Sequence, residues 1–133
     1  MADEVRIKIL SEKDIVLARE RGRALAQELG FSSSDPTLIA TAISEVARNI
    51  LKFAGRGEIV LVSVPQNPKK GIVIMARDEG PGIPDIPLAM RDGYSTSNGL
   101  GLGLPGARRL MDDFEVESVV GKGTTITMKK WTR

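Results

Sequence analysis

The sequence predicts an α+β fold: a two-layer α/β sandwich with a mixed, mostly antiparallel sheet and its helices on one face. Two observations predict it. The helical patterns cluster early and in the middle of the chain, and most of the expected strands come in pairs as hairpins. Apolar residues make up 41% of the 133 residues and aromatic residues only 4%. We therefore expect one domain over residues 1–133, with a core of aliphatic side chains.

The N-terminal part of the chain predicts a strand followed by a helix. Residues 5–9 alternate apolar and polar side chains, which is typical of a half-buried strand. Ser11 is a suitable helix N-cap, and Asp14 stands three residues later, where the partner of a capping box is found. Gly30 is a typical helix stop. The first helix is therefore expected between residues 11 and 30.

A second helix is expected from Asp35 to about Ala54. Asp35 can cap this helix, Pro36 suits its first position, and Gly55 follows its end. Apolar residues recur within it at spacings of three and four, which predicts one buried stripe. The stripe consists of Ile39, Ile43, Val46 and Ile50.

The second half of the chain predicts two hairpins separated by a long loop and a short helix. Strands are expected at residues 58–64, 71–76, 114–120 and 124–130. Residues 78–106 contain seven of the 14 glycines and four of the seven prolines, and we interpret this segment as a binding loop. A helix is expected from about Pro105 to Asp112. At the end of the last strand, Lys129 and Lys130 are expected to face solvent.

The composition excludes several classes of function. The chain has no cysteine, which excludes disulfides, thiolate metal sites and cysteine nucleophiles. It has no histidine, which excludes the usual zinc sites, Ser-His-Asp catalysis and a phosphohistidine relay within the chain. The net charge is only +2, with neither a basic stripe nor stacking aromatics, so nucleic acid is not an expected partner. No apolar run reaches the length of a membrane span and the N-terminus lacks a signal-peptide pattern, so we expect a cytoplasmic protein without a membrane partner.

Two polar residues of the second helix are candidates for a site. Glu45 and Asn49 are four residues apart, so they share a face of the helix, and both fall at the margin of the apolar stripe. A carboxylate and an amide at that margin face a cleft more readily than open water. The alternative is a solvated polar pair, and these two residues by themselves do not decide between the two.

Two glycine-containing segments could bind a ligand. Asp78 ends an apolar strand and precedes Gly80 and Gly82, so its carboxylate could accept a hydrogen bond from an exocyclic amine while the glycines let a flat ligand approach. A plain tight turn is the alternative. The alternating glycines of residues 99–103 precede a helix and could offer backbone N–H groups to phosphate oxygens. Neither this segment nor residues 121–124 match the Rossmann or P-loop spacing.

The order of these elements resembles the GHKL ATPases over nearly the whole chain. A helix with Glu45 and Asn49 is followed by an Asp-x-Gly-x-Gly segment, a loop, a Gly-x-Gly-x-Gly segment before a helix, and a Gly-x-Gly-Thr segment in a closing hairpin. The class includes gyrase-type ATPases, Hsp90, histidine-kinase catalytic domains, MutL and the anti-sigma-factor kinases. The resemblance implies the Bergerat type of fold with bound ATP and Mg²⁺.

Within this class the chain is most similar to the small bacterial serine/threonine switch kinases of the stressosome. The similarity lies in residues 42–50, 80–85, 92–97 and 103–106. Anti-sigma-factor kinases often have histidine at the position of Phe53, and this departure favours the switch kinases over them.

The resemblance implies a role for each candidate residue. Glu45 would accept the proton of the attacking hydroxyl group, and Asn49 would bind Mg²⁺ through its side-chain oxygen. Asp78 would bind the adenine amino group with Thr124 as its support, and residues 84–98 would form a lid. Further cofactor-binding positions are Gly80 and Gly82, which give adenine clearance, and Ser95, Thr96, Ser97, Gly99, Gly101, Leu102 and Gly103 toward the phosphates.

The resemblance also implies the function of a signalling switch. The chain would phosphorylate small STAS-domain regulators and then be released to a downstream partner such as a PP2C-type phosphatase. One alternative is an anti-sigma-factor-like binding module with ATP as a structural ligand, which would not need Glu45 as a base. The other is a detached histidine-kinase-type catalytic domain, against which the short chain without a dimerisation helix argues.

Overall fold

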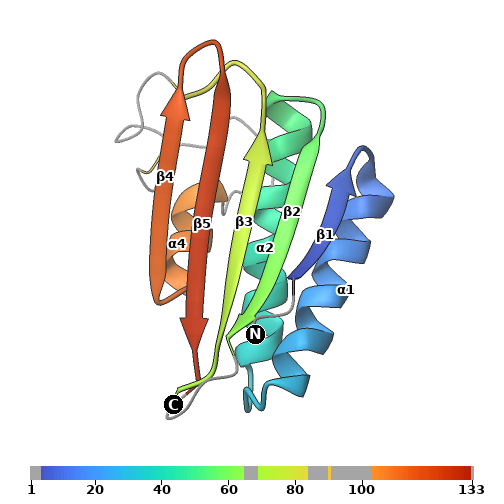
Figure 1. The fold of residues 1–133 in the computed structure, drawn as a ribbon, viewed down its shortest axis with the longest axis vertical. Helices are drawn as coiled ribbons and strands as arrows, with labels where there is room; N and C mark the ends of the chain where they lie inside the picture. The colour runs from blue at the N-terminus through green and yellow to red at the C-terminus, as the bar shows by residue number, and fades with distance from the viewer. Residues whose placement is uncertain (1–3, 65–68, 84–89, 91–102, 133) are drawn as a thin grey trace.

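The computed structural model describes residues 4–64, 69–83, 90 and 103–132. Its elements follow one another as Figure 1 shows. They are β1 (Glu4–Ile9), α1 (Glu12–Glu28), α2 (Asp35–Phe53), β2 (Gly57–Val64), β3 (Gly71–Asp78), α4 (Gly103–Leu110), β4 (Asp113–Val119) and β5 (Gly123–Trp131). Every strand and helix expected from the sequence is present within a few residues of its predicted bounds.

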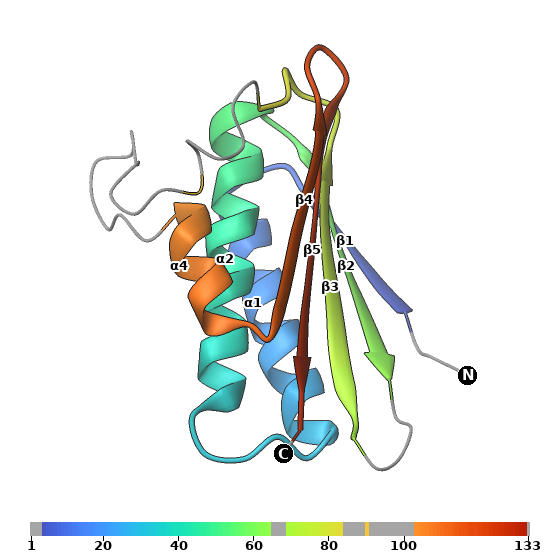
Figure 2. The same ribbon diagram turned by 90° about the vertical axis from the view of Figure 1, so that its left-hand side faces the viewer.

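The strands form one five-stranded sheet in the order β1-β2-β3-β5-β4. The two predicted hairpins, β2–β3 and β4–β5, are present, and β1–β2 and β3–β5 also pair antiparallel. The described strands therefore pair antiparallel throughout, where the sequence predicted a mixed, mostly antiparallel sheet. Figure 2 shows α1, α2 and α4 on one side of this sheet, which confirms the predicted two-layer α+β sandwich.

The predicted capping box of α1 is confirmed, while the N-cap of α2 is Ser34 and not the predicted Asp35, which already lies in the first turn. The Ser11 amide donates to Asp14 Oδ2 (3.0 Å), and the capping box of α1 is complete. Helix α2 begins at Asp35 with Pro36 in its first turn and ends at the C-cap Ala54. None of the helices in the described part of the chain is long and apolar enough to cross a bilayer.

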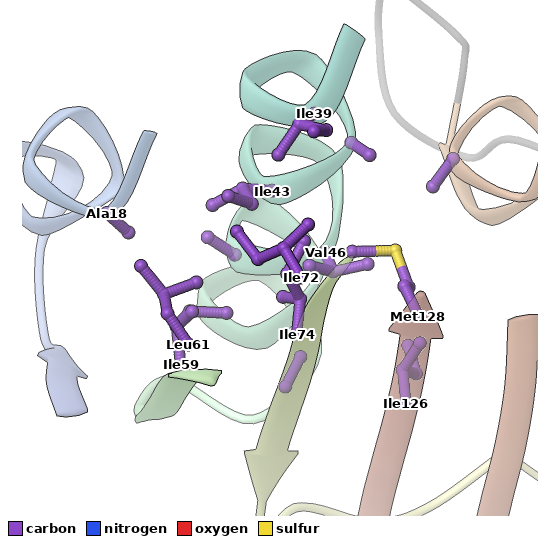
Figure 3. Close-up of a cluster of buried hydrophobic side chains, with 14 of the residues drawn as sticks. Ala18, Ile39, Ile43, Val46, Ile59, Leu61, Ile72, Ile74, Ile126 and Met128 are labelled. Atoms are coloured by element: carbon purple, nitrogen blue, oxygen red, sulfur yellow. The ribbon is translucent and has the colours of Figure 1, made fainter. Parts of the chain in front are cut away.

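The core lies between α2 and the inner face of the sheet, and it is aliphatic as predicted. Figure 3 shows Ile43 and Val46 of α2 facing Ile74 of β3 and Met128 of β5. The whole predicted stripe of α2 is 0–2% exposed. Helices α1 and α2 approach closely because Gly22 has no side chain: a Cβ there would overlap the side chain of Ile43.

Lys130 is buried, so the prediction of a solvated strand end is wrong for this residue. Its side chain is 8% exposed, and Nζ donates to the carbonyl of Leu110 (2.9 Å) at the end of α4. The reason is the alternation of β5, which places residue 130 on the helix-covered face. Lys130 therefore satisfies a C-terminal carbonyl of α4 that the helix itself cannot pair.

Candidate active site

Glu45 joins two segments that are far apart in the sequence. Its side chain is 12% exposed, and Oε1 accepts a hydrogen bond from the Gly103 amide (3.0 Å), 58 residues away at the first position of α4. Oε2 pairs with Nη1 of Arg48 (2.7 Å) on the next turn of α2. Glu45 is therefore held in a contact between helices, and the alternative of a solvated pair is wrong for this residue.

Asn49 lies one turn beyond Glu45 on α2 and is half-buried. Among the described residues, no three acidic, histidine or cysteine side chains are grouped closely enough to hold a metal ion between them. Mg²⁺ keeps several waters and is commonly bound by one or two protein oxygens and by phosphates. Asn49 can supply such an oxygen.

The segment after β3 is folded around the Asp78 carboxylate. Oδ1 of Asp78 accepts a hydrogen bond from the Gly80 amide (2.9 Å), two residues on. This local bond shapes the turn, as Asx turns do. Among the described residues, Gly80 donates the only hydrogen bond that reaches the carboxylate. The second oxygen, Oδ2, is the predicted acceptor for a ligand.

Gly80 and Gly82 have structural reasons to be glycine that the sequence did not indicate. A Cβ at Gly80 would lie 2.6 Å from Cβ of Ala54, at the end of α2. Gly82 has φ +81°, and a Cβ there would lie 2.6 Å from the Val119 carbonyl oxygen. The close approaches are therefore between parts of the chain itself. Clearance for adenine stays a prediction.

Thr124 lies beside Asp78 on the neighbouring strand, since the two residues are paired in the β3–β5 register. Thr124 is 7% exposed, and its hydroxyl bonds to the hydroxyl of Ser118 (2.9 Å). Ser118 also accepts from the Ile83 amide (2.7 Å) and so connects β4, β5 and the segment after β3. Within the described residues, no side-chain hydrogen bond joins Thr124 to Asp78, and the two residues are connected through the pairing of their strands.

The structure thus brings four of the described candidates together in two pairs. Glu45 and Gly103 are in contact, and Asp78 and Thr124 are neighbours in the sheet. The predicted lid over residues 84–98 lies outside the described residues except for Met90. The same holds for the predicted cofactor-binding positions Ser95, Thr96, Ser97, Gly99, Gly101 and Leu102.

Two further residues of the site had no predicted role. Arg48 forms the ion pair with Glu45, and its i,i+3 spacing was a usable signal. Ser118 connects three segments, and the signal was its place among the inward positions of β4. Because arginine and serine are common on protein surfaces, these signals do not by themselves single out the two residues. Their contacts in the structure do.

Comparison with known proteins agrees with this geometry. Residues 34–132 match the family model described as histidine kinase-, DNA gyrase B-, and HSP90-like ATPase. The chain belongs to this family. These ATPases are the GHKL class, and the match begins at the cap of α2 and includes every described candidate residue.

Similar proteins place the chain more closely within the GHKL ATPases. The serine/threonine-protein kinase RsbT of Bacillus subtilis is 54% identical over 133 residues, which is all of both chains. An anti-sigma F factor of Geobacillus stearothermophilus is 35% identical over 118 residues, covering 85% of this chain and 81% of that protein. The full-length similarity to RsbT places this GHKL protein in the serine/threonine-protein kinase group of its family.

Solved structures confirm the fold. The structure of the RsbU and RsbW domains of Rv1364c from Mycobacterium tuberculosis superposes with a TM-score of 0.65 at 18% identity, covering all of this chain and 33% of that one. The mycobacterial sensor histidine kinase MprB gives a TM-score of 0.56 at 18% identity, covering 100% of this chain and 99% of that one. Membership of an ATPase and kinase family implies that this GHKL domain uses ATP.

Proposed function

We propose that this GHKL kinase transfers the γ-phosphoryl group of ATP to a serine or threonine of a STAS-domain protein and acts as a signalling switch. The observation that supports it most is the contact between Glu45 and Gly103. It brings a carboxylate that is 12% exposed to the first turn of α4, where phosphate oxygens would bind. A base and a phosphate-binding backbone at one place are the parts that phosphoryl transfer requires.

Each described residue has a task in this reaction. Glu45 accepts the proton of the serine or threonine hydroxyl as that oxygen attacks phosphorus. The Gly103 amide donates to a phosphate oxygen and Asn49 holds Mg²⁺, which, when bound, neutralises charge on the phosphates. The Asp78 carboxylate binds the adenine amino group through Oδ2. Phosphoryl transfer depends on positioning and charge neutralisation, so no covalent intermediate with the protein is needed.

A second candidate function is a binding module that uses ATP as a structural ligand. The 35% identity to an anti-sigma F factor favours it, because that protein is named for its action on a sigma factor. Such a module would bind its partner equally well with Glu45→Gln, and no phosphate would reach the partner. The remaining possibility is a histidine kinase domain. Acid treatment of the phosphorylated partner distinguishes it from a serine/threonine kinase, because phosphoserine survives acid and phosphohistidine does not.

The switch itself follows from the charge that the reaction leaves behind. A phosphorylated partner carries about −1.5 to −2 charges at pH 7, close to Glu45 and to the phosphates of ADP. Repulsion between these like charges weakens the complex, so the kinase is released and becomes available to a downstream partner such as a PP2C-type phosphatase. A cytoplasmic location for these events stays a prediction from the sequence.

Size-exclusion chromatography with a purified STAS-domain partner tests the switch. The complex is expected to persist with ADP and Mg²⁺ and to dissociate with ATP and Mg²⁺. The Glu45→Gln protein is expected to keep the complex with either nucleotide, since it cannot phosphorylate the partner. A wild-type complex that is equally stable before and after phosphorylation would contradict the release step and leave an ordinary kinase.

A further inference from the structure

The Glu45 carboxylate has a partner on each oxygen. The Gly103 amide donates to Oε1 at 3.0 Å, and the Arg48 guanidinium pairs with Oε2 at 2.7 Å. These are its two partners among the described residues. The Arg48 side chain is 45% exposed while that of Glu45 is 12% exposed, so the arginine reaches from the surface toward a carboxylate that is mostly shielded from water.

In the proposed function, one N–H group has two possible acceptors. The Gly103 amide holds Oε1 of Glu45 in the structure, and the same amide would donate to a phosphate of bound ATP. An amide has a single proton, and sharing it would bring the carboxylate and a phosphate oxygen, both negatively charged, into close contact. Phosphate binding at Gly103 therefore releases Oε1 of Glu45.

The release of Oε1 has a consequence for the base. An oxygen that accepts a hydrogen bond from an amide cannot take a proton along the same direction, so the lone pair of Oε1 that faces Gly103 becomes available to the substrate hydroxyl once Gly103 turns to the phosphate. At that moment Arg48 is the remaining described contact that holds the carboxylate. Its guanidinium is planar and presents its donors in a fixed geometry, which suits it to hold one orientation of a carboxylate.

We propose that Arg48 is a positioning residue for the phosphoryl transfer: it holds Oε2 of Glu45 so that Oε1 faces the incoming hydroxyl. This rests on the proposed kinase function, in which Arg48 acts through Glu45 and contacts neither ATP nor substrate. The competing account is an ordinary surface ion pair, which contributes little to stability and nothing to chemistry. The two accounts predict different values of kcat for a variant without Arg48. If Arg48 positions Glu45, its loss displaces the carboxylate, and displacement of a catalytic group by about 1 Å costs about 100-fold in rate.

The experiment compares three variants with the wild type in a steady-state assay with a STAS-domain substrate, ATP and Mg²⁺. Arg48→Gln removes the positive charge. Arg48→Lys keeps the charge but lacks the planar guanidinium with its fixed donors. Arg19→Gln is the control. Arg19 is paired with Glu20 (2.9 Å) and is 38% exposed, so its loss removes a similar charge and ion pair from α1. Thermal unfolding of each protein verifies that it is folded.

We expect Arg48→Gln to lower kcat by about tenfold to 100-fold while the KM for ATP and the melting temperature stay near the wild-type values. Arg48→Lys should regain part of the loss, and Arg19→Gln should behave as the wild type. An Arg48→Gln protein whose kcat stays within about twofold of the wild type, or whose change is confined to KM, would overturn the positioning role. A wild-type protein that transfers no phosphate would instead overturn the proposed function, and the role of Arg48 with it.

Discussion

Replacing Asp78 by asparagine separates its structural role from its proposed role in binding adenine. The carboxylate accepts one described hydrogen bond, from the Gly80 amide to Oδ1 (2.9 Å). An asparagine can keep this bond through its own side-chain oxygen, so the turn should persist. What changes is the other terminal atom of the side chain: the carboxylate oxygen Oδ2, an acceptor, becomes an NH₂ group, which is a donor.

The expected loss of ATP affinity follows from that change. In the wild type the adenine amino group would donate to a charged acceptor, and in the variant two donors would face each other. Disrupting such a charged hydrogen bond costs about 1–3 kcal/mol. This corresponds to an increase of about 5-fold to 150-fold in the Kd for ATP. Discrimination against GTP should shrink as well, because guanine lacks the exocyclic amine at that edge.

Competition titrations with ATP and GTP measure both effects, and the matched control is Glu79→Gln. Glu79 is the adjacent residue and is exposed, so its substitution removes the same charge one residue away from Asp78. The control should change the Kd for ATP by no more than about twofold, since exposed charges interact weakly through water. An Asp78→Asn protein with the wild-type affinity for ATP would refute the assignment and place adenine elsewhere.

Three other substitutions test separate parts of the account. Asn49→Ala should abolish the Mg²⁺-dependent part of ATP affinity, which titrations with Mg²⁺ and with EDTA measure; equal loss in both conditions would argue against a metal ligand. Lys130→Met should destabilise the fold by about 1–3 kcal/mol in urea unfolding, because it removes the charged donor to the Leu110 carbonyl; an unchanged midpoint would show that water replaces that bond. Gly123→Ala should destabilise the fold and weaken ATP binding, because its Cβ would overlap the Asp78 carbonyl oxygen and its φ is +139°; wild-type values of both would contradict this.

The fold was predictable because its signals are local. The capping box at Ser11 and the apolar stripe of α2 each depend on residues within a few turns of one another, and both are present. Lys130 was predicted wrongly because a lysine pair at a strand end suggests solvent, while the alternation of β5 carries residue 130 under the end of α4. The position of residue 130 in the pleat therefore decides its burial, although the residue is a lysine.

The candidate site was predictable in its residues and not in its contacts. Glu45 and Asp78 could be chosen from motif order, but the bond between Glu45 and Gly103 depends on how α4 packs beside α2 across 58 residues of sequence. Tertiary pairing of this kind is set by the whole fold and leaves no periodic signal. The contact between Thr124 and Ser118 is local by comparison, since the two residues are paired in the β4–β5 hairpin, and it depends on the register of that hairpin.

The most direct test of the central claim is a phosphoryl-transfer assay with labelled ATP, Mg²⁺ and a panel of STAS-domain proteins. The wild-type protein is expected to label a serine or threonine of one partner with acid-stable phosphate. Glu45→Gln is expected to lose this activity by about 10²–10⁴-fold while its affinity for ATP changes only a few-fold. Label that appears at a similar rate with Glu45→Gln, or that is lost in acid, would contradict a serine/threonine kinase with Glu45 as its base.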